Sequence, residues 1–148
     1  MTKGEQAEAL FQEGYNCSQS VAGAFSEEMG LPRETVMRLS GGFGGGFGRQ
    51  REVCGAFSGA TLVAGMLRGY SDPAAREEKT EIYAMIQRLG VQFKAQNGSL
   101  ICRELLGLAS AEGTPQAEMR SETYYQKRPC AQICRIAADL LAEELAQG

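Results

Sequence analysis

The sequence predicts an all-α fold, a single-domain bundle of about six or seven helices with a glycine-rich loop. Apolar residues recur at helical spacing along almost the whole chain. No segment alternates apolar and polar residues at period two for long enough to form a convincing strand. With 148 residues, of which 43% are hydrophobic and 22% charged, residues 1–148 are expected to form one domain with its own core.

The first half of the chain contains three predicted helical segments. Lys3–Gln12 is rich in helix formers and carries apolar residues on one face. Residues 17–29 repeat apolar side chains at helical steps until Gly30 ends the segment. Pro32 can open a short helix that turns Leu39 inward.

The second half adds two long helices and two shorter features. Residues 53–67 combine small and apolar side chains at helical spacing, and a longer helix is expected from residue 72 to residue 97. A short helix then carries Cys102, and the last helix begins at Pro129. Residues 109–128 form a polar, irregular connection, and loops of this length in compact domains are often functional.

Composition excludes several classes of function. The net charge of -3 provides no basic surface for nucleic acid, and no apolar run approaches the ~18 residues of a membrane-spanning helix. The N-terminal residues lack the pattern of a secretory signal, so a cytoplasmic protein is expected. Because the chain has no histidine, it cannot form a Ser-His or Cys-His catalytic pair or a histidine-ligated haem.

The glycine-rich stretch at residues 40–59 reads SGGFGGGFGRQREVCGAFSG. It matches neither the dinucleotide-binding glycine pattern nor a P-loop, so no nucleotide cofactor is expected. A compact loop could instead turn the backbone N–H groups of Gly45 and Gly46 toward an anion. Arg49 and Arg51 add positive charge just before Cys54, although both side chains could equally be solvated.

Gly55 and Gly59 form a Gly-x-x-x-Gly pattern on the helix that follows Cys54. Small residues at this spacing allow two helix backbones to approach closely. One interpretation is therefore a tight helix crossing in the core. The other is that Gly55 and Gly59 leave room for a bulky group, such as a cofactor, beside Cys54.

Four of the five cysteines are predicted at helix N-termini, where exposed N–H groups and the helix dipole lower a thiol pKa. Asn16 and Gln19 form a capping-box pattern around the first cysteine, and Ser99 can cap the helix of the third. These four candidate catalytic or metal-binding residues are Cys17, Cys54, Cys102 and Cys130. Cys134 forms C-x₃-C with Cys130 and is expected to serve packing more than ligation.

The separated motifs resemble those of the C-GCAxxG-C-C family, which is described as redox-active and defined by four cysteines. They are GYNC at 14–17, FGGGFGR at 43–49, CGAFSG at 54–59, CRELLG at 102–107 and RPC at 128–130. By this resemblance the family cysteines correspond to the four named above. The central block reads Cys-Gly-Ala instead of Gly-Cys-Ala, and Cys134 is additional. The family is also similar to the iron–sulfur portion of split-Soret cytochromes. This sequence has no histidine and no C-x-x-C-H motif, so the haem part of that similarity is missing here.

Three hypotheses follow for the chemistry. The first is an iron–sulfur cluster or single metal ion held by the four thiolates for electron transfer. The second is metal-free thiol–disulfide redox chemistry, with Cys54 as the nucleophile of lowered pKa. The third is a helical interaction module with inert cysteines. The electron donor or acceptor is not identified by the sequence, and a homodimer with the site at its interface is left open.

Overall fold

The computed structural model describes residues 1–107, 114–122, 124 and 128–147, and within these residues the all-α prediction is confirmed. No strand occurs in the described residues beyond one isolated antiparallel bridge between Val53 and Ile101. None of the helices in these ranges is long and apolar enough to cross a membrane. The elements are α1 (Lys3–Gln12), α2 (Cys17–Gly23), α3 (Ser26–Met29), α4 (Arg33–Ser40), η1 (Gly41–Phe43), α5 (Gly44–Phe47), α6 (Gly55–Arg68), α7 (Arg76–Asn97), α8 (Cys102–Leu105) and α10 (Cys130–Ala146).

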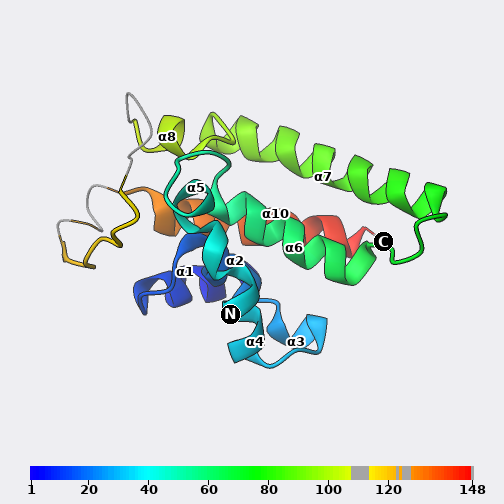
Figure 1. The fold of residues 1–148 in the computed structure, drawn as a ribbon, viewed down its shortest axis with the longest axis horizontal. Helices are drawn as coiled ribbons and strands as arrows, with labels where there is room; N and C mark the ends of the chain where they lie inside the picture. Colours follow the sequence, from blue (N-terminus) through cyan, green and yellow to red (C-terminus); the bar gives the residue numbers. More distant parts are fainter. Residues whose placement is uncertain (108–113, 123, 125–127, 148) are drawn as a thin grey trace.

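Helix α10 occupies the centre of the fold (Figure 1) and packs against α1, α2, α6 and α7. Its buried face carries Ile133, Cys134, Ala137 and Leu141, which belong to the main hydrophobic core. Burial of this apolar face, more than helix propensity, stabilises such an arrangement. The glycine-rich stretch and α8 lie near the N-terminal end of α10 (Figure 1), and this end holds the candidate site.

Three boundaries and one orientation differ from the sequence predictions. The long helix expected from residue 72 begins only at Arg76. Residues 17–29 form two helices, because the chain leaves helical geometry near Phe25. Val53 pairs with Ile101 in the isolated bridge, so α6 begins only at Gly55. Leu39 is 55% exposed, because α4 buries Val36, Met37 and Ser40, and position 39 lies off that face.

The Gly-x-x-x-Gly pattern of α6 forms a close crossing with α2. A Cβ atom at Gly59 would lie 2.6 Å from the Ser18 carbonyl oxygen, which belongs to the α2 backbone. A Cβ atom at Gly55 would lie 3.4 Å from the Cys17 sulfur. The crossing thus fixes α2, and with it Cys17, against the N-terminal end of α6.

We expect Gly59→Ala to destabilise the protein by about 2 kcal/mol, since the new methyl group meets backbone that cannot rotate away. Gly65→Ala is the matched control on the same helix: its Cβ meets nothing within 4 Å, so helix propensity should stabilise by ~0.5–1 kcal/mol. Urea unfolding of both variants measures the two changes. Equal effects of the two substitutions would contradict the close crossing.

Candidate functional site

The cysteines occupy the helix starts that the sequence predicts. Cys17, Cys102 and Cys130 are the first residues of α2, α8 and α10, and Cys54 is the N-cap residue of α6. The predicted capping box is present, because the Asn16 side chain accepts from the Gln19 N–H at 3.0 Å while Gln19 accepts from the Asn16 N–H at 3.1 Å. Caps of this kind fix where a helix begins and therefore where Cys17 lies.

Ser99 does not cap α8, whose N-cap residue is Ile101. The Ser99 hydroxyl instead accepts from the Ile101 N–H at 2.9 Å and donates to the Glu104 carboxylate at 2.6 Å. This local turn leads the chain into the bridge between residues 53 and 101. The flanking Cys54 N–H donates to the Leu100 carbonyl at 2.7 Å, which places Cys54 beside the start of α8.

The glycine-rich stretch folds into a left-handed turn, and α5 is therefore not a regular right-handed helix. Every residue from 45 to 49 has a positive φ, between +62° and +73°, and Phe47 and Arg49 are among them. The turn closes through bonds from the Arg51 N–H to the Gly45 carbonyl at 3.1 Å and from the Glu52 N–H to the Gly46 carbonyl at 3.0 Å. Non-glycine residues in this region carry strain, which often accompanies functional sites.

Cys17 and Cys130 form a directly interacting pair at this turn. Hydrogen bonding from the Cys130 thiol is the main cause that lowers the pKa of Cys17 to about 6. Further hydrogen bonds from the Gly45 N–H and from the Cys17 N–H act in the same direction, against the cost of burial. Cys17 is therefore a thiolate near neutral pH.

The remaining thiols stay protonated. The hydrogen bond to Cys17 and burial together raise the pKa of Cys130, and burial alone is the main cause that raises the pKa of Cys54, Cys102 and Cys134. The prediction that a helix N-terminus lowers the thiol pKa is therefore wrong for Cys54, Cys102 and Cys130. For Cys54, the expected nucleophile, the thiol is buried and the negative charge of Cys17 lies nearby. Cys134 is fully buried in the core, as its packing role predicts.

The pH dependence of alkylation tests the difference in pKa between Cys17 and the other thiols. A lowered pKa keeps the thiolate at lower pH, so the reaction of Cys17 with iodoacetamide should be half-maximal near pH 6, whereas an ordinary thiol reaches this point near 8.5. In Cys130→Ala the main stabilising bond is lost, and the curve should shift upward by at least about one pH unit. Peptide mass spectrometry follows each cysteine separately. A wild-type midpoint near pH 9 would contradict the assignment.

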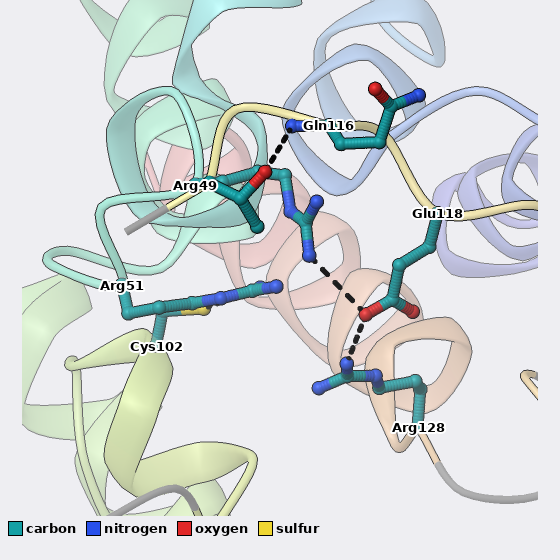
Figure 2. Close-up of polar contacts among 7 residues, drawn as sticks. Arg49, Arg51, Cys102, Gln116, Glu118 and Arg128 are labelled. Carbon is teal, nitrogen blue, oxygen red and sulfur yellow. Dashed lines mark hydrogen bonds and ion pairs between the residues drawn. The ribbon is translucent and has the colours of Figure 1, made fainter. Parts of the chain in front are cut away.

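A cavity of about 490 Å³ opens beside the pair and is lined by Cys17, Cys102 and Cys130. Its described lining also includes Glu118 and the four arginines Arg49, Arg51, Arg120 and Arg128. Figure 2 shows the Arg49 and Arg128 side chains converging on the Glu118 carboxylate, at 3.4 Å and 2.6 Å. The buried Arg51 side chain lies along Cys102, with Nη1 3.7 Å from the sulfur.

The sequence did not predict that Glu118, Arg120 and Arg128 would line the cavity. Arg120 stacks over the Phe11 and Tyr124 rings and donates to the Phe11 and Tyr15 carbonyls at 3.0 Å and 2.8 Å. It belongs to the connection predicted as irregular, part of which lies outside the described residues. Arg128 stands two residues before Cys130 inside the RPC motif, and that proximity was a usable signal. Arg120 offered no comparable signal.

The predicted glycines lie against the cysteines in the structure. Gly45 donates its N–H to Cys17, a Cβ at Gly46 would lie 2.8 Å from the Cys102 Cβ, and Gly55 borders Cys17. Their predicted role in holding a cofactor stays a prediction. Among the described residues, which include all five cysteines, no group of three or more Cys, Asp or Glu side chains is arranged to hold a metal ion.

Residues 15–144 match the family described as "Putative redox-active protein (C-GCAxxG-C-C)". Because the match covers most of the chain, this protein belongs to the C-GCAxxG-C-C family. The members of this family are described as redox-active proteins. No curated protein and no solved structure gave a significant match. The similarity to split-Soret cytochromes stays a prediction.

Proposed function

We propose that this protein carries out thiol–disulfide exchange through Cys17 and Cys130. The observation that carries the proposal is that Cys17 and Cys130 line the same cavity. In support, hydrogen bonding between the two thiols lowers the pKa of Cys17 to about 6 and raises the pKa of Cys130. A thiolate with a pKa near ambient pH is well suited to attack a disulfide. The residues 15–144 belong to a family described as redox-active, which agrees with this chemistry.

In the first step the Cys17 thiolate attacks one sulfur of an external small disulfide. A Cys17–substrate mixed disulfide forms, the substrate S–S bond breaks, and the other half leaves as a thiolate that takes a proton from water. Cys17 then no longer carries charge or accepts the hydrogen bond. The interactions with Cys17 that raise the pKa of Cys130 are thereby removed, so the first step makes Cys130 easier to ionise.

In the second step the Cys130 thiol loses its proton to water and attacks the Cys17 sulfur. The Cys17–Cys130 disulfide forms and the second substrate half leaves as a thiol. The protein has lost two electrons and the external disulfide has gained them. An external dithiol would return the protein to its starting state by the reverse exchange, so a small disulfide and a dithiol are the proposed electron acceptor and donor. A reducing cytoplasm is the proposed compartment.

The metal centre is the second candidate, because Cys54, Cys102, Cys130 and Cys134 all lie close enough to Cys17 for its charge to raise their pKa. In that function the four predicted ligands would supply thiolates to iron or another soft metal. No step is assigned to such a centre, because among the described residues no group of three or more Cys, Asp or Glu side chains is arranged to hold a metal ion.

Purification without oxygen separates the candidates. The thiol proposal predicts a colourless protein without stoichiometric metal, with five free thiols after reduction and three after oxidation by a small disulfide. Stoichiometric iron with visible absorption would support the second candidate and contradict the first. A metal-free protein with five thiols that resist oxidation would contradict both candidates and would favour the helical interaction module with inert cysteines.

A further inference from the structure

We infer that residues 114–122 form a strap across the cavity, and that Glu118 and Arg120 hold this strap so that Cys17 reacts with small disulfides and not with disulfides on bulky carriers or folded proteins. The inference deepens the proposed function by naming the residues that determine its substrate class, and it rests on that function for the role of Cys17. Its basis is the path of the strap and the contacts that attach it, which the exchange steps above do not use.

The strap forms part of the cavity wall. Residues 114–119 are exposed to solvent, and residues 114–121 form no helix or strand. Four residues of the strap line the cavity beside Cys17: Pro115, Ala117, Glu118 and Arg120. The strap therefore has the cavity on one side and solvent on the other, and access to Cys17 depends on where it lies.

Arg120 attaches the strap beside the nucleophile. Its guanidinium group donates to the Phe11 carbonyl at 3.0 Å and to the Tyr15 carbonyl at 2.8 Å, and it lies 4.3 Å from the centre of the Phe11 ring and 4.9 Å from that of Tyr124. Tyr15 stands two residues before Cys17. The positive charge of Arg120 is also one of the lesser causes that lower the pKa of Cys17. This contact thus fixes the strap next to the Cys17 thiolate.

Glu118 attaches the strap to two other parts of the cavity wall (Figure 2). One of its carboxylate oxygens lies 2.6 Å from Arg128 Nη2 and 3.4 Å from Arg49 Nη2. Arg128 stands two residues before Cys130, and Arg49 belongs to the left-handed turn. Together with Arg120, this carboxylate joins the strap to the end of α1, the turn and the start of α10.

These attachments can open while the helical core stays folded. The Glu118 side chain is 35% exposed, and ion pairs at such exposure contribute little to stability. Exposed segments held by polar contacts open at lower free energy than buried helices. With the strap in place, the cavity of about 490 Å³ has the size of a small-molecule site. A disulfide on a folded protein would reach Cys17 only after the strap has moved.

A matched pair of reagents tests this size limit. One is 2-hydroxyethyl 2-pyridyl disulfide, and the other carries the same 2-pyridyl disulfide group on dextran. In both reactions the Cys17 thiolate attacks the carrier sulfur, a mixed disulfide forms, and the S–S bond breaks. The released pyridine-2-thiolate takes a proton from water and is followed by absorbance.

The rate at Cys17 is the difference between the native protein and Cys17→Ser. We expect the dextran rate constant divided by the hydroxyethyl rate constant, normalised to the same ratio for N-acetylcysteine, to be at most about one tenth. A normalised ratio near one would overturn the inference.

Variants of the strap separate its effect from that of the cavity alone. Glu118→Ala should raise the normalised ratio by about threefold, and Arg120→Ala, which loses two hydrogen bonds and the ring contacts, by about tenfold. Glu122→Ala is the matched control, because this exposed acidic residue of the strap does not line the cavity and should leave the ratio unchanged. Equal ratios in all three variants and the native protein would contradict the strap.

Cleavage by trypsin after Arg120 keeps this test separate from the redox proposal. Trypsin must take the arginine side chain into its own pocket, so the bond is cut only when Arg120 has left its partners. In Cys17→Ser, Cys130→Ser, which cannot form the proposed disulfide, the rate should be at most about one tenth of that for a peptide of residues 114–124. Added Arg128→Gln, which removes the partner of Glu118, should raise this rate by about threefold.

Arg33→Gln is the control for the trypsin measurement, since this exposed residue at the start of α4 does not line the cavity. Cleavage of the protein at the rate of the peptide would overturn the strap even if the Cys17–Cys130 disulfide forms in the native sequence. A protected Arg120 in a protein that never forms this disulfide would support the strap and contradict the proposed function alone.

Discussion

Cys17→Ser is expected to lower the rate of exchange with a small disulfide at pH 7 by at least about a hundredfold. With a pKa of about 6, roughly 90% of Cys17 is ionised at this pH. The other four thiols have a raised pKa, so at most about 1% of each is ionised, and the variant retains only this background. The released thiol of the substrate is followed by absorbance.

Two further variants serve as controls for the Cys17→Ser result. Cys134→Ser removes a thiol that lies in the core and does not line the cavity, so exchange should continue. Cys130→Ser should stop after the first step and accumulate the mixed disulfide on Cys17, which mass spectrometry detects as added mass. A Cys17→Ser protein that exchanges at the native rate would exclude Cys17 as the nucleophile.

The second large effect is expected at Gly46, which lies in the left-handed turn. Its φ is +73°, and a Cβ there would lie 2.6 Å from the Glu52 nitrogen and 2.8 Å from the Cys102 Cβ. Gly46→Ala therefore combines the cost of a left-handed alanine with a clash against backbone, and should destabilise the protein by about 3 kcal/mol. If the variant folds, displacement of the turn should also raise the pKa of Cys17, because Gly45 donates to its sulfur.

Gly48→Ala is the matched control for this substitution. Its φ is +62°, yet a Cβ would meet nothing within 4 Å, so only the left-handed conformation is penalised, by about 1 kcal/mol. Urea unfolding compares the two variants, and alkylation at varied pH follows Cys17 in both. An equal loss of stability at the two positions would mean that residue 46 is not held against Glu52 and Cys102.

Much of this fold follows from local sequence patterns. Helical periodicity and caps act over a few residues, so they predict Lys3–Gln12 and the placement of Cys17 behind Asn16. The break near Phe25 was missed because the apolar spacing continues across it. Leu39 was misplaced because only the packing of α4 against the rest of the molecule determines which face is buried.

The site was less predictable because its contacts join distant segments. The sequence indicated which cysteines begin helices, but the pairing of Cys17 with Cys130 depends on how α2 packs against α10. Cys54 was expected to be the nucleophile because it lies at a predicted helix N-terminus, with the basic residues Arg49 and Arg51 just before it. In the structure these arginines line the cavity with Cys17 and Cys102, and Arg51 contacts Cys102.

The left-handed turn at residues 45–49 was not predicted, for a further reason. Glycines at positions 45, 46 and 48 indicate a backbone with positive φ, but Phe47, Arg49 and Arg51 also adopt positive φ. Side chains other than glycine rarely do so, and only the surrounding structure imposes this conformation.

Peptide mapping of the oxidised protein tests the central claim most directly. The fully reduced, metal-free protein is treated with a small disulfide, its remaining thiols are blocked, and the linked peptides are identified by mass spectrometry. We expect one disulfide, between Cys17 and Cys130, with Cys54, Cys102 and Cys134 recovered as blocked thiols. A disulfide between any other two cysteines, or five blocked thiols, would contradict the claim that this pair is the redox centre.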